Sequence, residues 1–321
     1  MVLSSKKEMR NICIYGVGGV GGYFGGKIAF TTSQLKGKTK NVSFIARGSH
    51  LQEIRKNGLI LNTSAQNGLI CKPDIATDDI DEIPAPDVCL ICVKSYDLEG
   101  EVKTLKRKIK NETVIIPLLN GVDIYERIRS VINNGIVLPS CVYVGTHREQ
   151  PGVVTQKGGD GIILSGFDPR FTDYNPDELT HFFHEREITF EWHDDPYKPI
   201  WEKYIFIASF GLVTAYAKKT LGEVLSDQVL KELVRKIMGE IISITERKGI
   251  KLPEDTANKS IEKAYNFPFE TKTSYQRDIE IKGQLNEGDI FGGTIIRIGK
   301  ALGVPTPVTQ SMYNEIQKNT G

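Results

Sequence analysis

A glycine-rich segment directly after a short apolar run constrains the fold of this chain more than any other feature. Residues 11–15 lead into Gly16-Val17-Gly18-Gly19-Val20-Gly21. A GxGxxG pattern that follows a buried strand and opens a helix is the dinucleotide-binding fingerprint in its proper context. Gly16 permits the tight turn, Gly18 lets a pyrophosphate approach the backbone, and Gly21 lets the helix pack against the sheet. We therefore expect residues 16–21 to bind a dinucleotide.

Length, charge and glycine content narrow the classes of partner. The chain has 321 residues, enough for two domains of about 150 residues each. Its 41 Lys+Arg and 40 Asp+Glu give a formal net charge of +1, so it has no excess charge with which to follow a nucleic-acid backbone or an anionic membrane. Its 31 glycines exceed the usual share of about 7%, and seven of them fall between Gly16 and Gly26. We expect a small-molecule partner, no nucleic acid and no membrane.

Short apolar runs with little polar alternation recur through the first half of the chain. They occupy residues 12–15, 42–46, 88–93 and 114–118. Such runs are typical of parallel strands that are buried on both faces, so this half is predicted to be a doubly wound α/β domain. Three further runs, at 141–145, 152–156 and 162–165, come with Gly and Pro turns. We expect them to extend the same sheet with antiparallel strands.

The pattern changes after Trp192. In residues 227–248 apolar side chains recur at i, i+3, i+4 and i+7, the spacing of an amphipathic helix, and a second stripe runs through residues 291–302. We therefore expect an α/β domain over residues 1–193, which binds the dinucleotide, and an all-helical domain over residues 194–321.

The end of the second predicted strand indicates which dinucleotide binds. Sites for NAD carry an acidic residue there, which accepts a hydrogen bond from the ribose 2′-hydroxyl. Here the strand leads into Arg47 and no carboxylate. A guanidinium suits a 2′-phosphate, which an Asp would repel. We predict NADPH over NADH, with Arg47 as the discriminating residue. The alternative is a solvated loop arginine.

The five cysteines indicate the compartment. They are odd in number and lie in apolar runs, which suits reduced thiols in a cytoplasmic protein better than a disulfide framework. The CxxC of Cys89 and Cys92 lies in a predicted strand, whose alternation sends the two sulfurs to opposite faces. No metal site is expected. The longest apolar stretch, 204–217, is shorter than the roughly 20 residues that span a bilayer.

Two further strand ends carry polar side chains. Lys94 follows the run 88–93, and Asn120 follows the run 114–118. Doubly wound folds bind ligands at the carboxyl edge of the sheet, so both residues are candidate ligand contacts.

Taken in order along the chain, these motifs resemble those of the ketopantoate reductases, the 2-dehydropantoate 2-reductase family. The matching segments are residues 16–26, 46–51, 93–98, 118–122, 201–203, 274–278, 286–289 and 293–307. Together they are far more specific than any one of them. The resemblance implies a Rossmann-type NADP-binding domain followed by a helical substrate domain, with the active site in the cleft between them.

The resemblance also implies roles for five residues. Lys203 matches the family's catalytic lysine, and Glu287 matches the carboxylate that faces it across the cleft. Our hypothesis is that Glu287 orients the substrate and the nicotinamide ribose. Asn120 matches the asparagine between cofactor and substrate, Lys94 a basic residue near the cofactor, and Ser274 the serine that binds the substrate carboxylate. Without the resemblance, Lys203 is best interpreted as a surface lysine and Glu287 as a carboxylate at a helix start.

These residue types suit the reduction of a 2-keto acid. Hydride transfer to the keto group builds negative charge on its oxygen, which a nearby ammonium stabilises and protonates. We therefore expect NADPH-dependent reduction of a 2-keto acid with Lys203 as the general acid. The resemblance implies 2-dehydropantoate as the substrate and pantoate as the product, a step of pantothenate biosynthesis.

The sequence departs from the family pattern where the family binds its substrate. Three positions that are asparagine in the family are Ile207, Gly211 and Leu221 here. Each unmade hydrogen bond costs roughly 1 to 3 kcal/mol, enough to change the preferred substrate. The interval that precedes Glu287 is also one residue longer than in the family, so Asp289 is the alternative carboxylate.

Two other functions stay open at this point. One is the reduction of another branched 2-keto acid, which the apolar Ile207 and Leu221 favour. The other is a non-catalytic NADP-binding sensor or interaction protein, against which the retained Lys203 argues. The apolar stripes of the helical half are explained by its own core, so the sequence leaves a monomer and a homodimer open.

Overall fold

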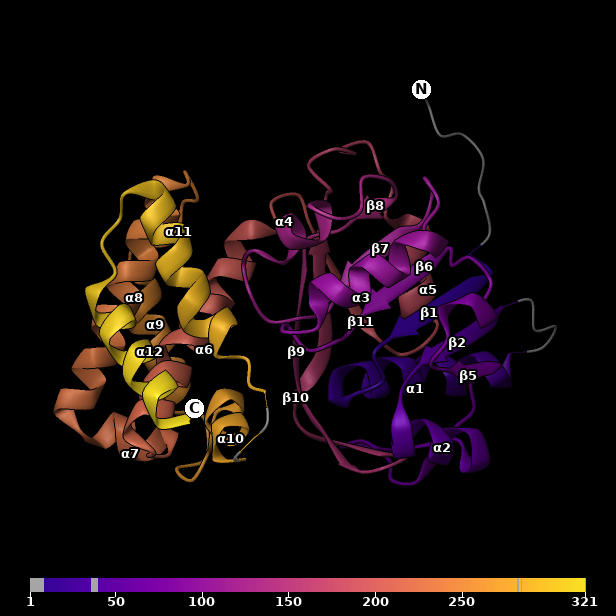
Figure 1. Ribbon diagram of the computed structural model, residues 1–321, viewed down its shortest axis with the longest axis horizontal. Helices are drawn as coiled ribbons and strands as arrows, with labels where there is room; N and C mark the ends of the chain where they lie inside the picture. The colour runs from indigo at the N-terminus through magenta and orange to yellow at the C-terminus, as the bar shows by residue number, and fades with distance from the viewer. Residues whose placement is uncertain (1–8, 36–39, 282, 284, 321) are drawn as a thin grey trace. The chain divides into compact units, whose positions relative to one another are not determined.

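The four apolar runs predicted as buried strands form the centre of a six-stranded parallel sheet in the computed structural model, which describes residues 9–35, 40–281, 283 and 285–320. The strands of this sheet are β1 (Asn11–Tyr15), β2 (Asn41–Ile45), β5 (Ile75–Thr77), β6 (Val88–Ile91), β7 (Val114–Pro117) and β8 (Ile136–Val137). Every residue of β6 and β7 is buried, because helices cover both faces of the sheet. The predicted parallel strands are confirmed (Figure 1).

The strand order creates a ligand-binding edge. The order is β5-β2-β1-β6-β7-β8, so the chain runs outward from β1 to β2 and β5 and then returns to the other side of β1. Doubly wound sheets bind ligands at such a reversal, beyond the carboxyl ends of the strands. The glycine-rich segment leaves the sheet at this point, directly after Tyr15.

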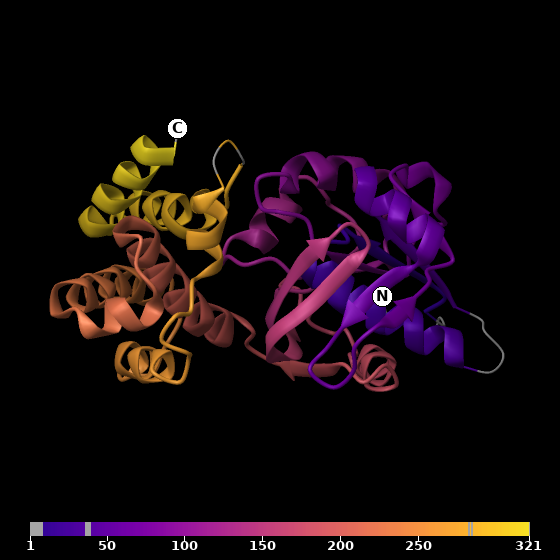
Figure 2. The ribbon, with the colours of Figure 1, turned by 90° about the horizontal axis from the view of Figure 1, so that it is seen from below.

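Residues 141–165 do not extend this sheet, and that expectation was wrong. They form a second sheet, of order β11-β10-β3-β4 with β9 paired to β10. Its strands are β3 (Leu59–Asn62), β4 (Leu69–Cys71), β9 (Ser140–Gln150), β10 (Val153–Gly166) and β11 (Thr189–His193). The long strands β9 and β10 run side by side as an antiparallel hairpin (Figure 2). The hairpin joins β3, because β10 pairs with β3 in parallel register.

Helix α1 (Gly19–Gln34) contacts both sheets, and its glycines make this packing possible. A Cβ on Gly25 would lie 2.9 Å from Ile14 of the first sheet. A Cβ on Gly22 would lie 2.6 Å from Val154 of the second sheet. Residues four apart share a helix face. Gly21 and Gly25 therefore leave one face of α1 without side chains, and Gly22 and Gly26 do the same for a neighbouring face. Part of the glycine surplus therefore serves packing rather than the cofactor.

The remaining helices of this half are short. They are α2 (Gly48–Asn57), α3 (Leu98–Leu105), α4 (Ile124–Arg129) and α5 (Asp177–His184), with 3₁₀ turns at Ile80–Glu82 and Lys106–Lys108. The helix α3 carries Glu99 and Glu101 in its first turn, where negative charge complements the helix dipole.

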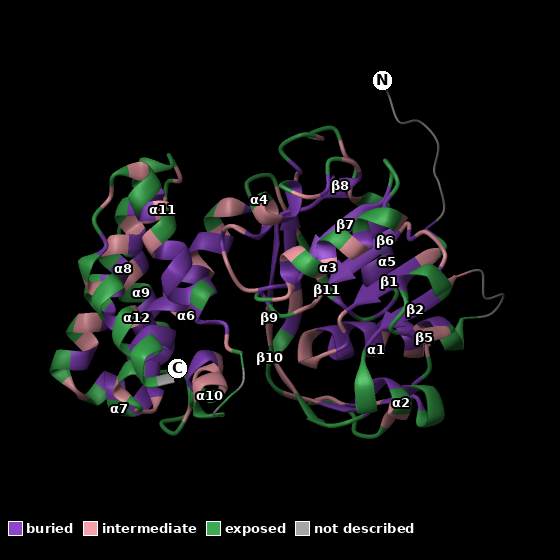
Figure 3. Cartoon of the chain, in the orientation of Figure 1, coloured by how far each residue is buried: buried purple, intermediate pink, exposed green. Residues whose placement is uncertain are grey.

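The rest of the chain is helical. The helices are α6 (Tyr197–Ala217), α7 (Leu221–Ser226), α8 (Gln228–Arg247), α9 (Thr256–Ala264), α10 (Ser274–Glu280), α11 (Thr294–Leu302) and α12 (Pro307–Thr320), with a π-helical turn at Asp289–Gly293. Helix α6 is the core element: 12 of its 21 residues are buried, and Figure 3 shows most of its length in purple. It contacts α7, α8, α9, α10 and α12. The predicted helix 227–248 is α8, and Asp227 caps it by accepting from the backbone N–H of Val229 and Leu230.

The chain divides into two units. Unit 1 contains Ile124–Pro196 and the residues before Asn120, and unit 2 contains Asn120–Asp123 and the residues from Tyr197 onward. The division thus lies at Pro196 rather than at residue 193, and the segment that follows β7 groups with the helices. Among the described residues no helix is both long and apolar enough to cross a membrane. The expected fold, a parallel-sheet α/β unit followed by a helical one, is confirmed.

Candidate active site

The glycine-rich loop has the geometry of a phosphate cradle. Gly16 has a φ of +96°, and a Cβ there would lie 2.9 Å from the backbone nitrogen of Val93. A Cβ on Gly21 would lie 2.0 Å from the carbonyl oxygen of Gly16. A Cβ on Gly18 would meet nothing within 4 Å. Side chains at positions 16 and 21 would therefore clash with the backbone, whereas the space beside Gly18 is open. Helix α1 begins at Gly19, and no side chain caps the backbone N–H groups at its start. Such a helix start suits an anion.

Arg47 lies two residues after β2, as the N-cap residue of α2. Its side chain is 61% exposed, and the guanidinium forms an ion pair with Glu101 of α3, while Asp97 lies 3.9 Å away. The other carboxylate oxygen of Glu101 accepts a hydrogen bond from the hydroxyl of Tyr15 at 2.7 Å. Burial, with the neighbouring Glu101, raises the pKa of Tyr15 well above its ordinary value. Arg47, which we expect to bind the 2′-phosphate, is thus already close to two carboxylates.

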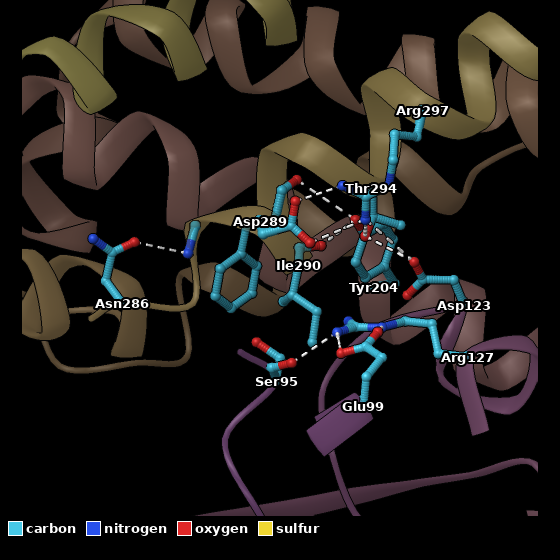
Figure 4. A network of polar contacts seen from close by, with 12 residues as sticks. Ser95, Glu99, Asp123, Arg127, Tyr204, Asn286, Asp289, Ile290, Thr294 and Arg297 are labelled. Atoms are coloured by element: carbon cyan, nitrogen blue, oxygen red, sulfur yellow. Dashed lines mark hydrogen bonds and ion pairs between the residues drawn. The ribbon is translucent and has the colours of Figure 1, made fainter. Parts of the chain in front are cut away.

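The segment after β6 is held by Arg127, a residue that the sequence did not single out. Its Nη2 donates to the carbonyl of Ser95 at 2.7 Å, and its Nε donates to Glu99 at 2.6 Å (Figure 4). Lys94 lies in the same segment and is exposed. Its carbonyl accepts from the backbone N–H of Asp97 at 3.0 Å, which closes a tight turn. Lys94 is therefore a cation at the carboxyl edge of the sheet.

In unit 2 the structure brings two of the expected site residues together. Lys203, half-buried in α6, donates from Nζ to Oδ1 of Asn120 at 2.8 Å. Asn120 follows β7, and Gly121 after it has a φ of +128°. This left-handed conformation favours glycine, so the sequence Asn120-Gly121 builds the turn that carries the amide.

A second set of polar contacts in unit 2 holds the same segment (Figure 4). Oδ2 of Asp123 accepts from the hydroxyl of Thr294 at 3.1 Å and lies 3.5 Å from Arg297. Arg297 also donates to Asp289 at 3.0 Å, and the carboxylates of Asp289 and Asp123 raise the pKa of Arg297 above its ordinary value. Asp123 directly follows the motif 118–122, which contains Asn120. This position was a signal for a site residue, but the sequence analysis did not identify Asp123.

The two candidate carboxylates have different surroundings. Glu287 is 8% exposed and lies just before the π-helical turn Asp289–Gly293. Asp289 is half-exposed and bound by Arg297. The turn itself is held to α6, because the hydroxyl of Tyr204 donates to the carbonyl of Ile290 at 2.6 Å.

Ser274 is the first residue of α10, and Thr273 caps this helix by accepting from the backbone N–H of Gln276. The hydroxyl of Thr273 also lies 2.8 Å from that of Thr214 on α6, which ties the start of α10 to the central helix. Ser274 is thereby held beside α6 in unit 2.

The three positions that depart from the family pattern are apolar in the structure. Ile207 is half-buried in α6, Gly211 is buried one turn further on, and Leu221 is 3% exposed at the start of α7. A Cβ on Gly211 would lie 3.8 Å from Tyr275 and from Phe291, at ordinary contact distance. These positions offer no side-chain donor or acceptor to a ligand.

Comparisons with known proteins identify the family of the chain. Residues 12–169 match the family described as Ketopantoate reductase PanE/ApbA, and residues 197–320 match Ketopantoate reductase PanE/ApbA C terminal. The chain is 26% identical over 312 residues to the uncharacterized oxidoreductase YkpB of Bacillus subtilis, with 95% of this chain and 97% of that protein covered. It is 25% identical over 330 residues to a 2-dehydropantoate 2-reductase of Mesorhizobium japonicum, with 96% and 97% covered.

A solved structure shows the same fold over the same extent. The crystal structure of a PanE/ApbA family ketopantoate reductase from Ralstonia eutropha JMP134 matches with a TM-score of 0.84 and 26% identity, and covers 96% of this chain and 97% of that one. The two matching family segments together span most of the chain, one in each unit. The chain therefore belongs to the ketopantoate reductase family and is an oxidoreductase of that family.

Proposed function

We propose that this protein reduces a 2-keto acid with NADPH, with 2-dehydropantoate as substrate and pantoate as product. The observation that carries the proposal is the 2.8 Å hydrogen bond from Lys203 to Asn120. A side-chain amide that binds the ammonium limits where it can point, and a proton donor to a ketone oxygen needs such positioning. Family membership supplies the reaction class.

Unit 1 supports the cofactor part of the proposal. Residues 16–21 would hold the pyrophosphate, because the loop is open at Gly18 and the start of α1 has uncapped N–H groups. Arg47 would bind the 2′-phosphate, and Lys94 would add a second cation at the same edge of the sheet. When bound, NADPH supplies the hydride.

Lys203 would act as the general acid. As charge develops on the keto oxygen, its ammonium stabilises that charge and delivers a proton from Nζ. An ammonium has three N–H donors, so the bond to Asn120 is compatible with a second bond to the substrate. Asn120 would keep the Nζ in place and contact both cofactor and substrate.

Glu287 is the carboxylate that we assign to orient the substrate and the nicotinamide ribose. Its competitor Asp289 is bound by Arg297 and serves the contacts that hold the segment before Ile124. Glu287 is buried, and a hydrogen bond is stronger in such a less polar environment than in bulk water. Ser274 would bind the substrate carboxylate.

A second candidate substrate follows from the apolar positions. With Ile207, Gly211 and Leu221 in place of three amides, the side chain of the substrate meets apolar groups. A branched 2-keto acid without a hydroxyl loses nothing there, whereas the hydroxyl of 2-dehydropantoate loses hydrogen bonds.

Steady-state oxidation of NADPH against a panel of 2-keto acids tests the proposal. The panel contains 2-dehydropantoate, its analogue without the hydroxyl, and straight-chain acids. The highest kcat/KM with 2-dehydropantoate supports the first substrate, and the highest with the analogue supports the second. Binding of NADPH without turnover of any member would contradict the enzymatic function.

A further inference from the structure

Glu101 contacts Tyr15, the last residue of β1, and Arg47, which lies two residues after β2. One of its carboxylate oxygens pairs with the guanidinium of Arg47, and the other accepts from the hydroxyl of Tyr15 at 2.7 Å. Its side chain is 20% exposed, whereas that of Arg47 is 61% exposed. The better-buried and doubly bonded partner is therefore Glu101, and it restricts where the exposed guanidinium can lie.

The charge around Arg47 is consequently not that of a simple phosphate site. Asp97 lies 3.9 Å from the same guanidinium, so one positive charge faces two negative ones. A 2′-phosphate that binds Arg47 has to share it with both carboxylates or displace them. Two like charges about 4 Å apart repel each other measurably even in water.

A 2′-hydroxyl meets the opposite situation. It can donate to a carboxylate and accept from a guanidinium, so the same pair of side chains satisfies both of its hydrogen-bonding functions. Sites for NAD place an acidic residue at the end of the second strand for this purpose. Here β2 lacks that residue, but α3 brings the Glu101 carboxylate to the same guanidinium from another element.

We propose that Glu101 is a coenzyme-specificity residue that opposes Arg47: it supplies the carboxylate that β2 lacks, favours the ribose 2′-hydroxyl and narrows the preference for NADPH over NADH. This inference rests on the proposed dinucleotide function, because it concerns the same site. Arg47 attracts the 2′-phosphate, and Glu101 weakens that attraction. The ratio of the affinities for NADPH and NADH therefore reports the balance between these two side chains.

The test measures dissociation constants for NADPH and for NADH by titration calorimetry. Glu101→Gln keeps an acceptor for Tyr15 and removes the charge beside Arg47. We expect it to raise the affinity for NADPH relative to NADH at least about fivefold. Glu101→Asp keeps the charge and should stay close to the wild-type ratio.

Asp81→Asn is the matched control. Asp81 is also paired with an arginine, Arg107, but this pair lies beyond the other end of α3, between the 3₁₀ turns Ile80–Glu82 and Lys106–Lys108. The control should leave the ratio unchanged. Asp97→Asn is a second variant on an exposed side chain that makes no capping hydrogen bond. It should shift the ratio in the same direction by a smaller factor, so the proposal stays testable if Glu101→Gln does not fold.

The outcomes separate this inference from the proposed function. A ratio that Glu101→Gln and Asp97→Asn leave unchanged, with both coenzymes still bound, overturns the role of Glu101 and leaves NADPH binding intact. Equal losses of both affinities would show a merely structural role and also overturn it. A wild-type protein that binds neither coenzyme contradicts the proposed function itself.

Discussion

Lys203 donates a 2.8 Å hydrogen bond to Asn120, although the two residues are 83 positions apart in the chain. The bond exists because the segment Asn120–Asp123 packs with the helices of unit 2 rather than with the strand that precedes it. Asp123 secures the other end of that segment through Thr294. The position of the amide thus depends on both ends of a short turn.

Replacing Asn120 tests what this bond does. Asn120→Ala removes the acceptor for the Lys203 ammonium, which then samples more positions. We expect kcat at saturating NADPH to fall about tenfold to hundredfold. Asn258→Ala is the control, since Asn258 is an exposed amide that accepts from Arg235 elsewhere in unit 2. An Asn120→Ala enzyme with the kcat of the control would show that Lys203 needs no positioning by this residue.

The substrate preference should respond to the half-buried Ile207. Ile207→Asn restores one amide of the family pattern on the same face of α6 as Lys203, four residues away. We expect kcat/KM for 2-dehydropantoate to rise about tenfold relative to the analogue without the hydroxyl. Ile207→Val keeps the apolar surface and should leave this ratio unchanged. A ratio that the two variants share would mean that residue 207 does not contact the substrate side chain.

The contacts of Asp123 should matter more for stability than those of Asp289. The side chain of Asp123 is 17% exposed and accepts from Thr294, so Asp123→Ala should lower the free energy of unfolding of unit 2 by about 1 to 3 kcal/mol. The pair of Asp289 and Arg297 is about half exposed on both sides, and Asp289→Ala should cost less than about 1 kcal/mol.

The chain offers a convenient probe for this comparison. Its two tryptophans divide between the units, with Trp192 in unit 1 and the buried Trp201 in unit 2. In a Trp192→Phe background the fluorescence of Trp201 therefore reports the urea unfolding of unit 2. Equal losses from Asp123→Ala and Asp289→Ala would contradict the different weights that we assign to the two carboxylates.

Some of these features follow from the sequence and others do not. The buried strands were predictable because β6 and β7 are apolar throughout, and α8 because its apolar spacing and its Asp227 cap are local signals. The strands that pair with β9 and β10 were not predictable, because strand propensity does not specify which strand lies alongside. The result is the second sheet.

The site shows the same limit. The glycine loop and Arg47 lie within one strand-helix unit each, so motif reasoning finds them. The pairing of Arg47 with Glu101 joins residues 54 positions apart. The sequence analysis predicted no partner for Arg47 on α3. Acidic residues such as Glu99 and Glu101 are common in the first turn of a helix because of the helix dipole, so they do not by themselves indicate an ion pair.

The pH dependence of stability should include a contribution from His50. Burial, with the nearby Arg148, lowers the pKa of His50 below its ordinary value of 6.5. In the unfolded chain this histidine takes up a proton at a higher pH, so the free energy of unfolding falls as the pH drops from 6.5 towards the native pKa. The stabilisation is fully present above that window.

His50→Asn should flatten this part of the pH profile. Asn keeps an acceptor for the backbone N–H of Gly152, which His50 now binds through Nδ1 at 2.8 Å. The slope removed is at most about 1.4 kcal/mol per pH unit, measured by urea unfolding between about pH 7 and pH 5. His184→Asn, on the exposed end of α5, is the control and should keep the wild-type slope. Identical slopes in all three proteins would exclude this role of His50.

The most direct test of the central claim is the kcat of Lys203→Ala with the preferred 2-keto acid, measured beside its dissociation constant for NADPH. Lys198→Ala is the matched control, because Lys198 is an exposed lysine on the same helix. If Lys203 is the general acid, kcat falls at least about a hundredfold in Lys203→Ala, while NADPH binding and the control stay at the wild-type level. A Lys203→Ala enzyme that binds NADPH and keeps most of its kcat would contradict the account.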